Sequence, residues 1–277
     1  MWYARIFVML SLVMCCSVNC SGMLYYPDHV MYVETDMMEF KPEDRVLKIE
    51  SGAEVHGWYF SAKEKPKGVI LFFHGNGQNR TSHIVEVYWL VKEGYDLFAI
   101  EYPGYGETDG VPTPENTVQS GHAALRHLMQ RNPNLPIIVY GQSLGGVVAL
   151  RSVLDLKNEV PVKFVAISSS FLSYQKVGQK VLSKSWVTWL FQWLPWVVLS
   201  DKYAPKDLVK NLTPTPLLVI HHKQDPIVPY QLGLELFERA SEPKQMWTLD
   251  GTEHNQIFTG EKGLLLRKKF LQKLSEI

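Results

Sequence analysis

The chain has 277 residues, of which 46% are hydrophobic and 20% are charged. This composition is typical of a globular protein with a large core, and it argues against intrinsic disorder. The 28 basic residues balance the 28 acidic residues, and no basic run appears, so the sequence offers no electrostatic surface for nucleic acid. The length suits one domain that follows a short N-terminal extension.

The N-terminal residues 1–20 are predicted to be a targeting segment. Residues 6–14 form an apolar run that is too short to span a bilayer and suits the centre of a signal peptide. Three interpretations remain open: a bacterial lipoprotein signal with a lipidated Cys20, a cleaved export signal, and an uncleaved membrane anchor. Residues 17–19, before Cys20, depart from the usual lipoprotein pattern. We expect an exported or membrane-associated protein whose folded domain covers residues 21–277.

All three cysteines, Cys15, Cys16 and Cys20, lie in this segment. No disulfide can therefore cross-link the folded domain. No cluster of cysteine and histidine residues suggests a metal site, so we expect none.

Short apolar runs alternate with longer mixed stretches from residue 45 onward. Strands are predicted over residues 45–50, 55–60, 68–73, 95–100, 136–140, 162–167, 216–220 and 245–249. Helices are predicted over residues 113–130, 144–156, 231–240 and 261–274. The first two strands form a hairpin, and the later alternation of strand and helix predicts an α/β fold: a mostly parallel sheet with helices on both faces.

Four predicted strands end in glycine-rich or polar turns. These turns are residues 74–77, residues 141–143, residues 224–225 and the loop that contains His254. Because ligands of open α/β sheets bind at the carboxyl ends of the strands, we expect the functional site to lie where these turns converge.

The turn at residues 141–146 fits the pattern G-x-S-x-G, with Ser143 at its centre. A predicted strand precedes it and a predicted helix follows it, which is the context of a nucleophile elbow. Such a sharp turn projects the serine hydroxyl above the sheet, and its glycines let neighbouring elements approach closely. The alternative is a tight turn with an incidental serine. The context favours Ser143 as a nucleophile.

A serine hydroxyl needs a general base within hydrogen-bond reach, and that base needs an orienting partner. His254 is the best candidate for the base, because it lies after the last predicted strand and before the last helix. His221 and His222 end an earlier strand, where a packed or solvent-facing role is expected. The elbow arrangement runs in the order serine, acid, histidine.

Asp225 is the predicted acid, because it directly follows the penultimate strand. Asp201, Asp250 and Glu253 are the alternatives. Asp201 falls within an insertion, and the other two lie beside His254 in the sequence, where they are expected to shape its loop.

An oxyanion formed during acyl transfer needs two fixed hydrogen-bond donors, usually backbone amides. One is expected from Leu144, directly after the nucleophile. The other is expected from Asn76 in the turn of residues 74–77, with Gly75 or Gly77 as alternatives.

Five motifs occur in an order that resembles the α/β-hydrolase superfamily. They are His-Gly-Asn-Gly at 74–77, Tyr-Pro-Gly-Tyr-Gly at 102–106, Gly-Gln-Ser-Leu-Gly-Gly at 141–146, Asp-Pro-Ile-Val-Pro at 225–229 and Glu-His-Asn at 253–255. The chain is most similar to the serine-aminopeptidase-like branch, which includes ABHD-type esterases and thioesterases. The resemblance covers roughly residues 47–274. It implies the α/β-hydrolase fold, a triad of Ser143, Asp225 and His254, an acyl-enzyme mechanism and no cofactor.

The chain departs from this family at one place. His221 and His222 stand where the family usually has His-Gly before the acid loop. The departure concerns the local backbone and the shape of the substrate site.

The insertion at about residues 171–212 contains half of the eight tryptophans. Trp186, Trp189, Trp193 and Trp196 follow helical spacing and would share one face, although Pro195 should break or kink the helix. One interpretation is a helical lid in which Trp186, Trp189 and Trp193 bind an acyl chain or touch a membrane. The other is a short cap helix that packs on the domain.

The predicted function is hydrolysis of acyl esters or thioesters by a serine hydrolase. One alternative is an aminopeptidase-like enzyme, which would need an acidic residue near the site to hold the substrate ammonium group. The other is a non-catalytic, envelope-associated protein with a hydrolase fold. The only partners expected are a small acyl substrate and, through the N-terminus, a membrane.

Overall fold

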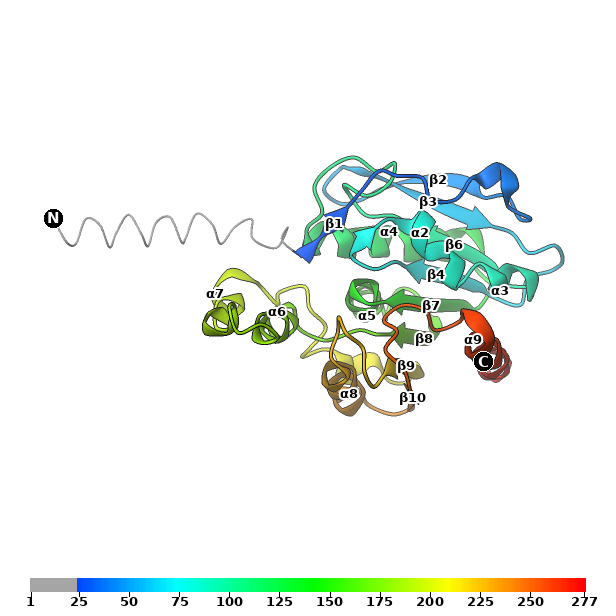
Figure 1. Ribbon diagram of the computed structural model, residues 1–277. Coiled ribbons are helices and arrows are strands. Elements are labelled where there is room, and N and C mark those ends of the chain that lie inside the picture. Colours follow the sequence, from blue (N-terminus) through cyan, green and yellow to red (C-terminus); the bar gives the residue numbers. More distant parts are fainter. Residues whose placement is uncertain (1–23) are drawn as a thin grey trace.

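The computed structural model describes residues 24–277, so the predicted targeting segment and Cys20 lie outside the described residues. In this part of the chain the main sheet has eight strands in the order β10-β9-β8-β7-β4-β6-β3-β2 (Figure 1). The strands are β2 (Glu43–Lys48), β3 (Glu54–Phe60), β4 (Val69–Phe73), β6 (Asp96–Ile100), β7 (Ile137–Gln142), β8 (Val162–Ser168), β9 (Leu217–His222) and β10 (Lys244–Leu249). Strand β3 pairs antiparallel with both β2 and β6. The remaining neighbours pair in parallel, which confirms the predicted mostly parallel sheet.

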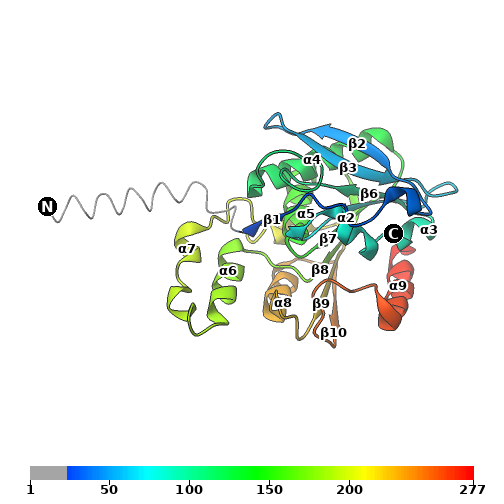
Figure 2. The same cartoon turned by 45° about the horizontal axis from the view of Figure 1, so that its top comes forward.

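Helices cover both faces of this sheet (Figures 1 and 2). The α-helices are α2 (Arg80–His83), α3 (Trp89–Lys92), α4 (Pro114–Arg131), α5 (Leu144–Asp155), α6 (Tyr174–Ser183), α7 (Pro195–Val198), α8 (Tyr230–Arg239) and α9 (Gly260–Leu274). Helices α4, α5 and α8 contribute to the apolar cluster on one face, and α3 and α9 contribute to the cluster on the other. The arrangement is the α/β-hydrolase fold.

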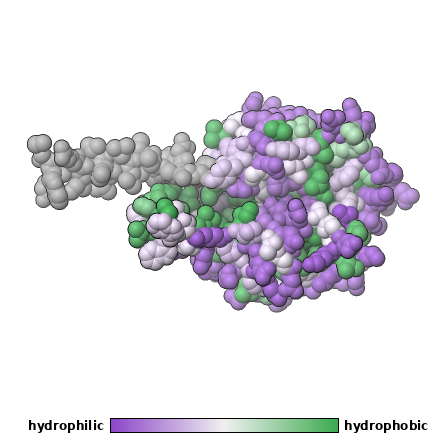
Figure 3. All heavy atoms as spheres, viewed as in Figure 1, coloured by the Kyte–Doolittle hydropathy of each residue, from purple (hydrophilic) through white to green (hydrophobic). Residues whose placement is uncertain are grey.

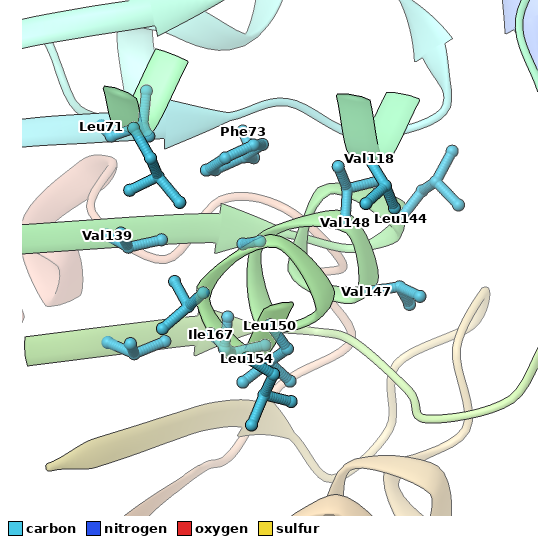
Figure 4. Packing of buried hydrophobic residues seen from close by; sticks show 14 of the residues in the cluster. Leu71, Phe73, Val118, Val139, Leu144, Val147, Val148, Leu150, Leu154 and Ile167 are labelled. Carbon is cyan, nitrogen blue, oxygen red and sulfur yellow. The ribbon is translucent and has the colours of Figure 1, made fainter. Parts of the chain in front are cut away.

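Strand β4 shows how the sequence builds both apolar layers. Its five residues are all fully buried, so the strand reads as a continuous apolar run. Because successive side chains of a strand point to opposite faces, Leu71 and Phe73 enter the cluster under α4 and α5, whereas Ile70 and Phe72 enter the opposite cluster. Figure 4 shows Leu71 and Phe73 facing helix α5, where Val148 lies.

Helix α4 begins at the position that the sequence indicates. The Thr113 hydroxyl oxygen accepts a hydrogen bond from the Asn116 amide at 3.1 Å, and Pro114 occupies the first helical position. The side-chain cap satisfies one of the free amides of the first turn, and proline lacks an amide there. The helix therefore starts next to the turn after β6 and packs against α5.

Short elements complete the described chain. These are the two-residue strands β1 (Tyr26–Pro27) and β5 (Gly77–Gln78), and the 3-10 helices η2 (Thr35–Met37), η3 (Ile84–Glu86), η4 (Trp189–Phe191) and η5 (Val209–Leu212). Strands β1 and β5 pair in parallel beside the turn that follows β4. They attach the start of the described chain to the carboxyl end of the sheet.

The insertion between β8 and β9 is helical, and we call it the lid. It carries α6, η4, α7 and η5, and Figure 2 places α6 and α7 together beyond the end of the sheet. The Ser173 hydroxyl caps α6 by accepting the Lys176 amide. Pro195 begins α7 instead of kinking a longer helix, because proline fits the first turn. Within residues 24–277 no helix is long and apolar enough to cross a membrane.

Candidate active site

The structure brings Ser143, Asp225 and His254 together at the carboxyl end of the sheet. The Ser143 Oγ lies 3.0 Å from Nε2 of His254. On the other side of the ring, Nδ1 of His254 lies 2.7 Å from Oδ2 of Asp225. If His254 is neutral with the proton on Nδ1, that nitrogen donates to the carboxylate and leaves Nε2 to accept the serine proton. The geometry is therefore ready for deprotonation of the hydroxyl.

The backbone of Ser143 adopts the strained conformation of a nucleophile elbow. Its φ of 54° and ψ of −121° are rare for a residue with a side chain. The turn is held by the Ser143 amide, which donates to the Ser168 carbonyl oxygen at 2.8 Å. Glycine is required at 145, because a Cβ there would lie 2.2 Å from the Phe73 carbonyl oxygen. The absence of that Cβ lets α5 start directly against the end of β4.

Asp225 is held as a carboxylate acceptor in the loop after β9. Its Oδ1 accepts the backbone amides of Ile227 and Val228 at 2.8 and 2.9 Å, which leaves Oδ2 for His254. Burial raises the pKa of Asp225, but the hydrogen bond and charge of His254 and these two amides outweigh it, so the net pKa lies below its ordinary value. The side chain is therefore ionised at neutral pH and can orient the imidazole.

His221 and His222 pack around the acid loop. His221 is fully buried, and its Nε2 lies 2.9 Å from the Val228 carbonyl oxygen and 3.5 Å from Oδ2 of Asp225. His222 lies 3.5 Å from Glu253. Burial lowers the pKa of both histidines. Of the two expected roles, the structure shows the packed one for His221, whose ring donates to the Val228 carbonyl oxygen in the loop that holds Asp225.

Asn76 and Leu144 both line the pocket that contains Ser143. Leu144 is the first residue of α5, a position whose amide has no acceptor within the helix. The Asn76 carbonyl oxygen accepts the Tyr26 amide at 2.9 Å and the Tyr105 hydroxyl at 2.7 Å. These bonds fix the turn after β4 beside the elbow. The two predicted oxyanion donors thus come from adjoining segments.

Two serines directly after β8, which no sequence motif indicates, brace the site. The Ser170 hydroxyl donates to the Ser143 carbonyl oxygen at 2.7 Å. The Ser169 hydroxyl donates to the His254 carbonyl oxygen. Their only signal in the sequence is their place directly after a buried strand, at the edge of the sheet where the other turns meet. They hold the backbones of the elbow and of the histidine loop.

A second network links three of the turns through side-chain amide and imidazole groups. Gln142 donates to the Asn255 carbonyl oxygen at 2.7 Å, and its own Oε1 lies 3.0 Å from Nδ1 of His83. The opposite nitrogen of His83 lies 3.0 Å from the Gly77 carbonyl oxygen. Burial lowers the pKa of His83. A neutral imidazole has one N–H, so it can donate to only one of its two acceptors at a time.

Glu86 anchors the loop that follows His254. Its Oε1 accepts the backbone amides of Ile257 and Phe258 at 2.8 and 3.0 Å. Burial raises the pKa of Glu86 to about 8, against the opposing effect of these amides. The carboxyl group therefore fixes the loop while it remains largely protonated at neutral pH.

An apolar pocket opens above Ser143. It has a volume of about 430 Å³, within the range of ligand sites. Its lining residues are Leu24, Tyr26, Asn76, Ser143, Leu144, Phe171, Val177, Gly178, Val181, Leu182, Leu194, Pro195, Val198, Leu199, Ile227 and Val228. The lid supplies much of this wall through α6 and α7. Within the described residues no aspartate, glutamate, lysine or arginine lines it.

The tryptophans of the lid lie elsewhere than expected. Trp186, Trp189 and Trp193 are absent from the lining of this pocket and are exposed. The expected shared helical face does not form, because the segment divides into α6, η4 and α7. The lid contributes leucine, valine and proline to the pocket instead, so the predicted aromatic slot is corrected to an aliphatic one.

One group of side chains has the geometry of metal ligands. Ligand atoms of Asp44, His56 and Glu107 lie within 4.8 Å of one another. Ion pairs within the protein account for this group, because His56 lies 3.6 Å from Asp44 and Arg80 lies 2.7 Å from Glu107. None of the three lines the pocket above Ser143.

Known proteins are similar to this chain in sequence or in fold. A family profile described as serine aminopeptidase, S33, matches residues 64–214. The uncharacterized protein YfhR of Salmonella typhimurium is 27% identical over 266 residues, which cover 90% of this chain and 86% of YfhR. The lysophosphatidylserine lipase ABHD12 of Mus musculus is 28% identical over 193 residues, which cover 66% of this chain and 48% of that protein.

Among solved structures, the esterase Pf2001 of Pyrococcus furiosus superposes with a TM-score of 0.69 over 91% of this chain and 98% of the esterase. At 19% identity, this likeness supports the fold alone. The family profile covers more than half of the chain, from residue 64 to residue 214. The chain therefore belongs to the serine aminopeptidase S33 family of the α/β-hydrolase superfamily.

Proposed function

We propose that the protein is a serine esterase that hydrolyses carboxylic esters or thioesters with an apolar acyl chain. The observation that carries this proposal is the position of Ser143. Its hydroxyl lies 3.0 Å from His254 and also lines a pocket of aliphatic side chains. A nucleophile with a paired base supports acyl transfer, and the apolar wall favours a hydrocarbon chain.

The proposed mechanism has two halves. In the first, Nε2 of His254 takes the Ser143 proton as Oγ attacks the carbonyl carbon, while Asp225 stabilises the imidazolium. The amides of Leu144 and Asn76 donate to the oxyanion. Collapse of this intermediate breaks the bond to the alcohol or thiol, which leaves with the proton from His254. In the second half, water attacks the acyl-enzyme with the same base, and the acid departs from Ser143.

The lining of the pocket favours an acyl substrate over an aminopeptidase substrate. An aminopeptidase must hold a substrate ammonium group, which needs a carboxylate or a comparable acceptor. No acidic side chain of residues 24–277 lines the pocket. The similarity to a protein named lysophosphatidylserine lipase agrees with an acyl ester substrate. A non-catalytic role as an envelope protein is disfavoured by the ready geometry of the three side chains.

A panel of substrates tests this function. p-Nitrophenyl esters of increasing chain length should be compared with aminoacyl amides, with Ser143→Ala as the blank. We expect kcat/KM to rise with acyl length until the pocket is filled, and amides to be poor substrates. A preference for aminoacyl amides would contradict the proposal.

The location of the enzyme is also part of the proposal. The apolar run of residues 6–14 and Cys20 support export, with or without lipidation. Mass measurement of the mature N-terminus distinguishes a lipidated Cys20 from a cleaved, unmodified end and from an intact chain. An intact, unmodified chain in the cytosolic fraction would contradict export and membrane association alike.

A further inference from the structure

The outer surface of the lid carries an unusual set of exposed aromatic and aliphatic side chains, which we call the lid patch. It consists of Trp186, Trp189, Leu190, Phe191, Trp193 and Trp196. Trp186 is 88% exposed and Leu190 is 68% exposed, although both are large apolar residues. Figure 3 shows hydrophobic residues gathered at the end of the molecule where Figure 1 places α6 and α7. A concentration of this kind on a soluble surface marks an interaction site.

From this patch we infer that the lid docks on the surface of a phospholipid bilayer, with the mouth of the pocket turned toward the lipid. The first support is the composition of the patch. Tryptophan is enriched where proteins meet the membrane interface, because its ring is apolar and its N–H is polar. Trp186, Trp189 and Trp193 have this character, and leucine and phenylalanine lie beside them.

The charge around the patch gives the second support. Residues 171–200 contain three lysines and no acidic residue. Lys180 is exposed on α6, and Lys184 is exposed directly after it although its ammonium group also donates to the Pro226 and Ile227 carbonyl oxygens. The third, Lys176, pairs with Glu235. Apolar side chains flanked by lysine are the arrangement of protein segments that lie on anionic membranes, where the cations approach the phosphate groups. A protein partner would not by itself require this combination.

The third support is continuity between the patch and the pocket. Leu194, Pro195 and Val198 line the pocket, while Trp193 and Trp196, their neighbours in the chain, are exposed on the lid patch. One short segment therefore has a face toward the pocket and a face toward the surroundings. A substrate with an acyl chain could pass from the lipid into the pocket along this segment without crossing bulk water.

The fourth support is the point where residues 1–23 join the described chain. Leu24, the first described residue, lines the same pocket as Val198 and Leu199 of the lid. An anchor in the N-terminal segment would therefore be attached beside the lid. Both features would hold the same face of the protein to the same membrane.

Quenching of tryptophan fluorescence by brominated lipid tests this inference on the full-length chain. The vesicles contain dibrominated phosphatidylcholine and phosphatidylglycerol, and every version of the protein carries Trp2→Phe, so that the N-terminal segment gives no signal. Outside the lid, Trp58 and Trp247 are buried in the domain and Trp89 is partly buried against its core, so contact with lipid is reported mainly by the four exposed tryptophans of the lid. The test variant is Leu190→Ser with Phe191→Ser. Its matched control is Leu264→Ser with Leu265→Ser, which removes two exposed leucines from α9.

We expect brominated lipid to quench the tryptophan fluorescence of the parent protein and of the α9 control. In the Leu190 and Phe191 variant, the extent of quenching should fall by at least about half. Hydrolysis of a short soluble ester should stay unchanged in that variant, which shows that it folds. Quenching should also persist in Ser143→Ala. The experiment therefore tests membrane docking independently of ester hydrolysis.

Two results would overturn the inference. One is the absence of quenching in the parent protein, or equal quenching in the parent and in the Leu190 and Phe191 variant. The other is a dimer, measured by sedimentation velocity, that the same variant converts to a monomer while lipid quenches neither form. That result would assign the patch to a second copy of the chain.

Discussion

Gln142, the residue before the proposed nucleophile, donates its side-chain amide to the carbonyl oxygen of Asn255, the residue after His254, at 2.7 Å. This bond ties the elbow directly to the histidine loop, two segments that are far apart in the sequence. Because His83 in turn contacts Gln142, the turn after β4 joins the same network. Gln142 thus contributes to the relative positions of nucleophile, base and oxyanion donors, together with Ser169, Ser170 and Glu86.

Replacing Gln142 should therefore damage turnover more than binding. We expect Gln142→Ala to lower kcat by about 10- to 100-fold, because a displacement of a catalytic group by about 1 Å has an effect of this order. KM for a soluble ester should change little, since Gln142 does not line the apolar pocket. Steady-state kinetics beside Gln272→Ala, an exposed site on α9, check this. A change confined to KM would contradict a positioning role.

Asp225→Asn removes the charge of this side chain but keeps its shape, and it should abolish most of the activity. We expect Asp225→Asn to lower kcat by about 10⁴-fold, because an amide can donate to Nδ1 and so favours the wrong imidazole tautomer. The control is Asp250→Asn, since Asp250 was the alternative acid and pairs instead with Lys223 at 2.9 Å. Near-normal activity of Asp225→Asn, or a severe loss in Asp250→Asn, would reassign the acid.

The strands and central helices could be predicted because each has a local signal. Residues 68–73 were predicted as a buried strand, and β4 spans Val69–Phe73. The helix predicted at residues 231–240 is α8, Tyr230–Arg239. Hydrophobic periodicity and capping residues lie within a few positions of each other, so they can be read from one segment. The pairing of β2 with β3 was likewise expected from the hairpin.

The braces of the site could not be predicted in this way. Glu86 contacts Ile257 and Phe258 across 171 and 172 positions, and nothing near Glu86 in the sequence indicates that loop. The contacts of Ser169 and Ser170 could not be predicted either, because serine is common at strand ends. The acyl slot lined by tryptophans, one of the two interpretations of the lid, differs from the structure for another reason. Helical spacing of tryptophans predicts a shared face only when the helix is continuous, and here it is broken between Ser183 and Pro195.

Filling the pocket from the lid should shorten the preferred acyl chain. Val181 lines the pocket at its exposed rim. We expect Val181→Trp to lower kcat/KM for long-chain esters by about 10-fold or more, since extra volume excludes terminal methylene groups. Short esters should be hydrolysed normally.

Val187→Trp gives the matched control for this change. Val187 is exposed on the same lid but does not line the pocket. Its chain-length profile should equal that of the wild type. If both variants shift the profile equally, the acyl chain does not occupy the pocket above Ser143.

Glu86 should make the folded protein less stable as the solution becomes alkaline. Burial raises its pKa from 4.5 to about 8, so between these values the folded state keeps a proton that the unfolded state has lost. The free energy of unfolding therefore decreases as pH rises through this window and levels off above it. In Glu86→Gln, the side-chain amide oxygen can still accept the Ile257 and Phe258 amides, but the side chain has no ionisable proton.

Denaturant unfolding of both proteins at pH 5 and pH 9 measures this effect. We expect Glu86→Gln to gain stability relative to the wild type as the pH rises. Parallel pH dependence of the two proteins would mean that Glu86 ionises in the folded state near its ordinary pKa.

The central claim, that Ser143 is the activated nucleophile, is tested most directly by covalent labelling. The full-length protein is treated with a fluorophosphonate probe, and the modified peptide is identified by mass spectrometry. We predict a single label on Ser143 that is lost in Ser143→Ala. The label should be retained in the control Ser51→Ala, because Ser51 is exposed and does not line the pocket. Undiminished labelling of Ser143→Ala, or labelling at another serine of the wild type, would contradict the account.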